Sequence, residues 1–116
     1  MHITSLDKTE KSVPNMEGAK GVYKQVPLSA RDGAPNFSFR VFTIEPGGNT
    51  PFHTHPYEHL NYIIDGSGFL VDESGEHPVS KGDFAMVMPG EKHQYRNPAK
   101  NCGNLVMICA VPSQFE

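Results

Sequence analysis

Histidine is the residue whose spacing in this sequence points most directly to chemistry. Three of the six histidines, His53, His55 and His59, fall within seven residues. Side chains two residues apart in an extended strand point to the same face, about 7 Å apart along the backbone, and neutral imidazole binds zinc, copper, iron and nickel. The spacing predicts that His53 and His55 bind one metal ion, that His59 returns to the same face, and that His93 arrives from another strand.

Other interpretations of these residues stay open. A single histidine is more often a surface or hydrogen-bonding residue than a ligand, so the prediction rests on the cluster. His2 and His77 lie outside it and are expected to be solvated. Glu58 would point away from His59 in a regular strand and is kept as an alternative ligand. No residue stands out as a general base, and the catalytic residues are unknown at this stage.

The elements that position these residues are predicted to be short strands. Eleven Gly and ten Pro interrupt the chain before any segment reaches the usual length of a helix. Residues 37–44 are rich in aromatic and β-branched side chains, and 60–64 and 69–71 flank a Gly-containing turn that predicts a hairpin. A second reversal is expected at 72–76, with further strands at 78–80, 84–88, 94–96 and 105–111. Such a series predicts an antiparallel sandwich or barrel.

Two segments around the histidines resemble the two sequence motifs of cupins. Residues 47–66 have a glycine, five residues, HxH, three residues, a fourth ligand and a closing glycine, and residues 82–97 are similar to the second motif. His59 stands where many cupins carry glutamate, and Met88 stands where the second motif usually has proline. Over roughly residues 20–112 the chain is similar to the small, single-domain, tetra-histidine manganese cupins of bacteria.

The resemblance implies an all-β fold, a double-stranded β-helix or jelly-roll barrel. It implies one divalent transition metal per subunit, bound by His53, His55, His59 and His93. Manganese is the expected metal, with iron, zinc, nickel or copper as alternatives. The resemblance also implies a homodimer, which the two large-residue faces of strand 37–44 favour.

Length and composition restrict the domain organisation and the partners. A chain of 116 residues fits one domain; residues 1–20 are polar and aperiodic, which predicts an N-terminal arm or edge strand before a barrel domain over 21–116. The net charge of −3 and the scattered Lys and Arg argue against nucleic acid as a partner. No stretch reaches the ~20 apolar residues of a membrane span, and no signal peptide is recognisable. We therefore expect a cytoplasmic protein that does not bind membranes.

Three functions fit such a site. The first is a metal-dependent, dioxygenase-like oxidoreductase acting on a small molecule; the second is a non-catalytic cupin that binds or senses a small ligand; the third is a metal-dependent isomerase or lyase. One barrel can host many chemistries, so the fold does not choose between them. Side chains next to the ligands are candidates for a partly apolar pocket: Phe52, Tyr57, Met86, Met88 and Tyr95.

Overall fold

The structure is a computed structural model that describes all 116 residues. Strands and three single-turn 3₁₀ helices make up its regular structure, and no helix is long and apolar enough to cross a membrane. The elements are η1 (Leu6–Lys8), β1 (Lys20–Leu28), η2 (Ala30–Asp32), β2 (Phe37–Asn49), β3 (His59–Asp65), β4 (Ser67–Asp72), β5 (Gly75–Ser80), β6 (Phe84–Val87), β7 (Gln94–Arg96), β8 (Leu105–Pro112) and η3 (Ser113–Phe115).

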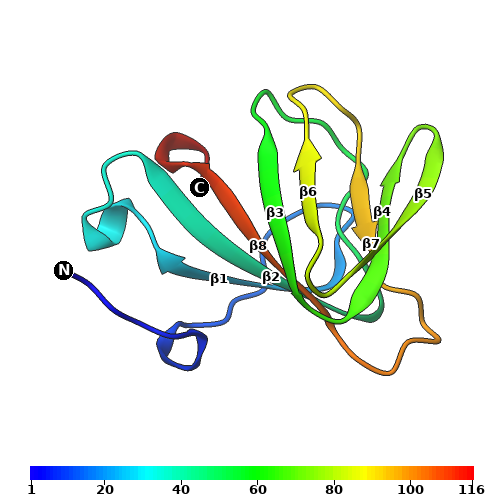
Figure 1. Cartoon of the computed structure of the whole chain (residues 1–116), viewed down its shortest axis with the longest axis horizontal. Coiled ribbons are helices and arrows are strands. Elements are labelled where there is room, and N and C mark those ends of the chain that lie inside the picture. The colour runs from blue at the N-terminus through cyan, green and yellow to red at the C-terminus, as the bar shows by residue number, and fades with distance from the viewer.

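All eight strands belong to one curled antiparallel sheet. Their order is β5-β4-β7-β2-β8-β3-β6, and β1 pairs with β2 beside this path. Figure 1 shows β2 and β8 crossing the molecule as long neighbouring strands, with β3 to β7 curling around one half of it. The chain is a single-domain jelly-roll barrel, which confirms the predicted all-β fold.

The connection between β3 and β4 corrects one prediction. Residues 60–64 and 69–71 do not form a hairpin, because β3 pairs with β6 and β8 whereas β4 pairs with β5 and β7. The chain instead crosses through Gly66, whose φ is 79° and where an added Cβ would lie 2.0 Å from the carbonyl oxygen of Asn104. Two glycines near a turn indicate a change of direction, and they do not say which strands pair afterwards. The reversal expected at 72–76 is the hairpin between β4 and β5.

β1 was not predicted, although it is one of the longest strands. Its sequence contains Pro27 and several polar residues, so it lacks a clear alternation. Its only strand partner is β2, and an edge position tolerates proline because one side of the backbone needs no ladder hydrogen bonds. β5, which carries Pro78, lies at one end of the sheet order, where the same tolerance applies.

The chain that precedes β1 packs against it. The side chain of Gln25 donates hydrogen bonds to the carbonyl oxygens of Leu6 and Thr9, at 3.0 and 3.1 Å. Ser12 and Lys24 form an isolated β-bridge. Gln25 is buried, so these bonds satisfy a polar side chain that would otherwise be left without partners.

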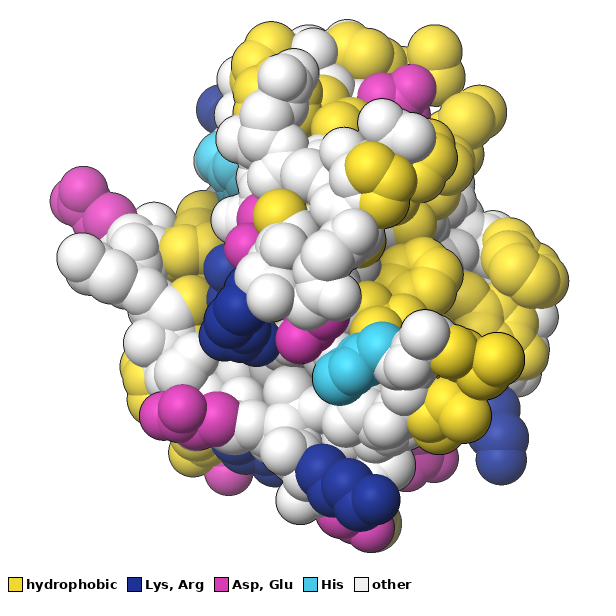
Figure 2. Space-filling view, turned by 90° about the vertical axis from the view of Figure 1, so that its left-hand side faces the viewer, with side chains coloured by type: hydrophobic (Ala, Val, Ile, Leu, Met, Phe, Trp, Pro, Cys, Tyr) yellow, Lys and Arg dark blue, Asp and Glu magenta, His cyan; other side chains and the backbone are white.

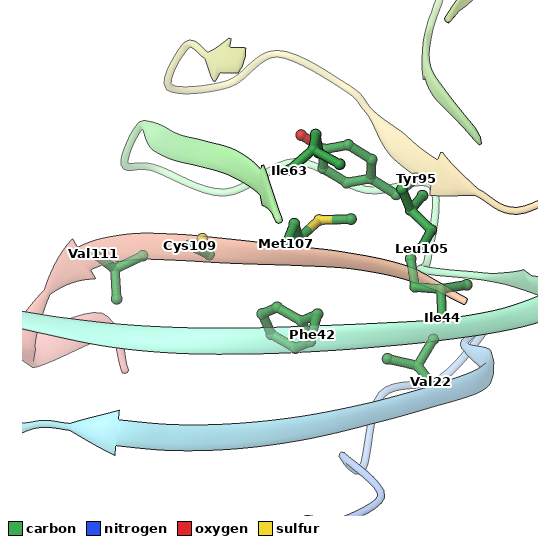
Figure 3. Packing of buried hydrophobic residues seen from close by; sticks show 9 residues of the cluster. All are labelled: Val22, Phe42, Ile44, Ile63, Tyr95, Leu105, Met107, Cys109 and Val111. Carbon is green, nitrogen blue, oxygen red and sulfur yellow. The ribbon is translucent and has the colours of Figure 1, made fainter. Parts of the chain in front are cut away.

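An apolar core fills one end of the barrel. Phe42 on β2 lies opposite Met107 on β8, which lies opposite Ile63 on β3. Ile44 and Leu105 form the next layer, and all five side chains are buried. Figure 3 shows the side chains of β2 and β8 pointing toward those of β3 and β7 across the barrel interior.

The layer on the other side of Phe42 is polar. Arg40 lies opposite Cys109, which lies opposite Asn61, and all three residues are buried. Because side chains alternate along a strand, Arg40 points inward with Phe42, and Asn61 points inward with His59. The register of three strands therefore carries a guanidinium, a thiol and an amide into the barrel next to the histidines.

Candidate metal centre

His53 and His93 are neighbours because their backbones form an isolated β-bridge. The N–H of His53 donates to the carbonyl of His93 at 3.1 Å, and the N–H of His93 donates to the carbonyl of His53 at 3.0 Å. His55 follows outside any regular strand, and His59 is the first residue of β3. The prediction that the HxH segment lies in a regular strand is therefore wrong. The ring centroids of His53 and His55 are nevertheless only 5.4 Å apart.

Three of the imidazoles are oriented by backbone carbonyls two residues away. Nδ1 of His53 lies 2.7 Å from the carbonyl of Pro51, Nδ1 of His55 lies 2.7 Å from that of Tyr57, and Nδ1 of His93 lies 2.8 Å from that of Glu91. A carbonyl oxygen only accepts, so each Nδ1 carries the proton and donates it. In a neutral ring this leaves the lone pair on Nε2, which is the tautomer that a metal ligand needs.

The nitrogen atoms of these three rings converge. One nitrogen from each of His53, His55 and His93 lies within 4.8 Å of the others. The Nε2 atoms of His55 and His93 are 3.2 Å apart, and with both protons on Nδ1 two lone pairs face each other there. Burial lowers the pKa of both rings, and the neighbouring imidazoles lower it further. A divalent cation between the rings relieves this repulsion, so the residues fit a transition metal.

His59 is adjacent to this cluster and is held differently. Its ring stacks on that of His55, with centroids 3.8 Å apart. Its Nε2 lies 3.3 Å from a guanidinium nitrogen of Arg40, and because arginine only donates, this Nε2 accepts. Burial first, and then the charges around it, lower the pKa of His59 to about 2. The structure therefore brings three of the four predicted ligands together. The fourth, His59, lies beside them and is hydrogen-bonded to Arg40.

The rings of His53, His59 and His93 line a cavity of about 110 Å³ inside the barrel. Of the predicted pocket residues, Tyr57 and Tyr95 line this cavity, whereas Phe52, Met86 and Met88 are exposed and do not. Burial raises the pKa of Tyr95, whose hydroxyl donates to Asn61 at 3.1 Å. Sequence reasoning missed the other seven residues of the wall: Met16, Arg40, Phe42, Thr50, Asn61, Met107 and Cys109.

An aromatic stack connects the site to the C-terminal segment. The ring of Tyr57 stacks on His55 with centroids 4.4 Å apart, and the ring of Phe115 in η3 stacks on Tyr57 at 4.3 Å. Glu58 and His77 are exposed and do not belong to the cluster. His77 instead contacts Asp72 on the β4–β5 hairpin.

Known proteins define the class to which this barrel and site belong. The family model of the cupin domain matches residues 40–110, which include all four histidines and Arg40. The chain therefore belongs to the cupin family. The oxalate-binding protein of Thermotoga maritima is 28% identical over 100 residues, which cover 84% of this chain and 83% of that protein. The (R)-mandelonitrile lyase of Granulicella tundricola is 38% identical over 52 residues, 44% of this chain and 40% of the lyase.

Solved structures have the same fold. The polyketide cyclase RemF of Streptomyces resistomycificus superposes with a TM-score of 0.91 and 24% identity, over 97% of this chain and 80% of the cyclase. A predicted oxalate decarboxylase of Thermotoga maritima superposes with a TM-score of 0.79 and 24% identity, over 97% of this chain and 99% of that chain. These similarities establish the barrel and leave the reaction to be argued from the site.

Proposed function

We propose that this cupin binds one divalent transition metal ion per subunit and uses it as a dioxygenase-like oxidoreductase on a small molecule. The observation that carries the proposal is the convergence of nitrogens from His53, His55 and His93 beside a buried cavity. Manganese is the proposed metal, with iron as the next candidate. Such an ion supplies redox chemistry, whereas zinc has none.

His59 is proposed as the fourth ligand. In the structure its Nε2 accepts from Arg40, so binding a metal through that atom requires this hydrogen bond to be given up. An all-histidine site leaves the charge of the ion uncompensated, because neutral imidazole adds none. Backbone carbonyls orient three of the rings through their Nδ1 atoms. The apolar side chains of Phe42 and Met107, in the cavity wall beyond the histidines, limit the access of water to the site.

Two relatives favour other functions for the proposed site. The oxalate-binding protein supports a cupin that binds a small ligand without turning it over. The mandelonitrile lyase supports a lyase reaction, for which a metal at the present site would act as a Lewis acid. Neither needs a redox-active metal, and this distinguishes both from the oxidoreductase.

Metal content is the first test of the proposal. Protein purified without added metal and then loaded with Mn²⁺ should hold about one ion per chain, measured by mass spectrometry of the dialysed protein. The variant His93→Ala removes a ligand whose backbone makes two hydrogen bonds and whose Nδ1 donates to a carbonyl. This variant should reduce the Mn²⁺ occupancy at least tenfold. His77→Ala, which removes an exposed histidine outside the cluster, is the matched control and should keep it. Absence of bound metal in the wild-type protein would contradict both metal-dependent reactions.

The reaction type is tested with three probes on the loaded protein. Consumption of dioxygen that depends on a candidate substrate supports the oxidoreductase. Release of benzaldehyde from mandelonitrile under anaerobic conditions favours the lyase, and stoichiometric binding of oxalate without product favours the binding protein. Full activity of the zinc form would contradict the oxidative reaction.

We also propose a homodimer formed through the outer face of the sheet. Leu60 pairs with Met86 and Tyr62 pairs with Phe84 across β3 and β6, so these side chains share a face. Leu60, Phe84 and Met86 are 50%, 82% and 61% exposed. Figure 2 shows hydrophobic side chains gathered along the top and right of one side of the molecule. Contiguous exposed apolar surface of this kind marks interaction sites.

A further inference from the structure

Arg40 is a buried cation that no carboxylate neutralises. It is only 7% exposed, and none of the ion pairs in the structure includes it. One terminal nitrogen donates to the sulfur of Cys109 at 3.0 Å and approaches His59, and its Nε is buried without a partner. A buried guanidinium without a counter-charge is costly, because desolvation is not repaid by an ion pair.

The surroundings of Arg40 offer little compensation. The guanidinium carbon lies 5.2 Å from the centre of the Phe42 ring, which gives a weak attraction at most. No Asp or Glu side chain lines the cavity. The positive charge of Arg40 also acts on Lys24, whose pKa is lowered by burial first and then by Arg40, while Glu116 raises it. Glu116 does not line the cavity, so within the cavity the charge of Arg40 has no carboxylate to balance it.

The guanidinium and the histidine cluster face the same cavity. Arg40 and His53, His59 and His93 all line it. A guanidinium nitrogen of Arg40 lies 3.3 Å from Nε2 of His59. The ring of His59 stacks on that of His55. The Nε2 atoms of His55 and His93 are 3.2 Å apart. A divalent ion at the cluster would add two further positive charges with no carboxylate among the three converging ligands.

We propose that Arg40 is an anion-binding residue and that the cavity takes small molecules carrying a carboxylate, which Arg40 binds while the molecule contacts the metal. The proposal rests on the proposed function for the metal and adds the charge class of the ligand and the residue that recognises it. The planar guanidinium can donate two parallel hydrogen bonds to a carboxylate, and only one of its nitrogens is engaged within the protein. The cavity of about 110 Å³ is small beside the sites of drug-sized ligands, so only a few heavy atoms fit.

Binding of acetate and glycolate, with acetamide as an uncharged analogue, tests the charge preference. Calorimetric titration of the Mn²⁺-loaded wild-type protein should show binding of both anions and at least tenfold weaker binding of acetamide. Equal affinity for acetate and acetamide would overturn the proposal, whatever the metal content. This comparison uses the wild-type chain only, so it does not depend on the folding of any variant.

The variant Arg40→Met tests the residue. Methionine has a similar length without charge, and replacing a buried unpaired ion by an apolar side chain is often neutral or stabilising. We expect Mn²⁺ content and thermal stability at least equal to those of the wild type, and at least tenfold weaker binding of acetate and glycolate. Lys24→Met, which removes a neighbouring charge that does not line the cavity, is the control and should change the affinity by less than about threefold. Equal losses in both variants would assign the effect to general charge and overturn the role of Arg40.

Repeating the titration without metal distinguishes failure of the proposed metal site from failure of the proposed anion binding. If the wild-type protein binds no Mn²⁺, the proposed function fails, and anion binding by the metal-free protein that depends on Arg40 would still support the inference. If Mn²⁺ binds and Arg40→Met binds the anions as tightly as the wild type, the inference fails and the metal site stands.

Should Arg40→Met not fold, Arg40→Lys keeps the charge without the planar pair of donors, and it should bind the anions with intermediate affinity. Unchanged affinity in Arg40→Lys would contradict recognition by the guanidinium.

Discussion

At the scale of single residues, the site depends on which ring nitrogen carries a proton. Carbonyls of Pro51, Tyr57 and Glu91 fix Nδ1–H in three rings and leave Nε2 free. Each carbonyl is two residues from its histidine, so the local chain orients the ligand without help from distant side chains. The metal-binding tautomer of each ring is therefore set by a carbonyl two residues away, as soon as the local chain adopts its folded conformation.

His59 supplies a prediction at this scale. If it is the fourth ligand, His59→Ala should lower the Mn²⁺ affinity by at least the factor of about 10 to 100 that loss of a partner supporting a ligand costs. Glu58→Ala is the matched control, because Glu58 is adjacent and exposed and lies outside the cluster. Equilibrium dialysis against Mn²⁺ measures both. A loss with Glu58→Ala and none with His59→Ala would reverse the assignment.

The histidines could be found from the sequence, but Arg40 was missed. HxH spacing and the two motifs are local patterns, and they placed all four histidines in one group. Arg40 is a lone charge within the apolar strand β2, and it alternates in phase with Phe42 and Ile44, which are buried. A charged residue on the inward face of a predicted strand is the signal that could have identified it.

At the scale of elements, strand existence was easier to predict than strand pairing. The strand β2 begins at Phe37 as expected, but it continues to Asn49. Apart from the β4–β5 hairpin, the partners of β3 and β4 lie far along the chain, in β6, β8 and β7, and a local turn signal contains no information on them. β1 was missed because its edge position permits a sequence with proline and polar residues.

The crossing at Gly66 leads to a stability prediction. Gly66 and Gly90 have nearly equal φ, 79° and 78°, but only at Gly66 does an added Cβ collide with backbone, at 2.0 Å from Asn104. Gly90→Ala should therefore cost the backbone strain alone, about 1–2 kcal/mol. Gly66→Ala should cost roughly 1–3 kcal/mol more because the backbone must move. Urea unfolding of both variants measures the difference, and equal losses would show that the crossing is more adaptable than the structure indicates.

The β4–β5 hairpin leads to a prediction on pH. Hydrogen bonds from Ser74, and then from His77, lower the pKa of Asp72 from 3.8 to about 2. The folded state thus favours the carboxylate, so this contribution to stability is present above about pH 4 and is lost as the pH falls toward 2. The difference in thermal unfolding temperature between wild type and Asp72→Asn should shrink over that interval.

A neighbouring acid provides the control for that measurement. Glu73→Gln removes an exposed carboxylate on the same turn whose side chain makes no hydrogen bond in the structure. Its unfolding temperature should differ from that of the wild type by a small amount that does not follow the pH dependence seen for Asp72→Asn. If both variants behave alike, the effect comes from the net charge of the hairpin and not from the bonds of Asp72.

At the scale of the whole molecule, the exposed apolar face predicts the oligomeric state. Phe84→Lys places a charge at the most exposed aromatic residue of that face, so it should shift the proposed dimer to monomer in sedimentation velocity. Val13→Lys is the control, since Val13 is 75% exposed but lies in the N-terminal segment. A wild-type protein that sediments as a monomer at micromolar concentration would contradict the dimer.

The position of β8 in the sheet has a consequence for biosynthesis. It is the last strand in chain order, yet it lies between β2 and β3 and pairs with both. On the ribosome, β2 and β3 emerge first and wait without their common neighbour until β8 has left the exit tunnel. Until then, their inward apolar side chains are accessible to chaperones and to other nascent chains. The barrel, and with it the pocket that gathers Arg40 and the histidines, cannot close before β8 has been synthesised.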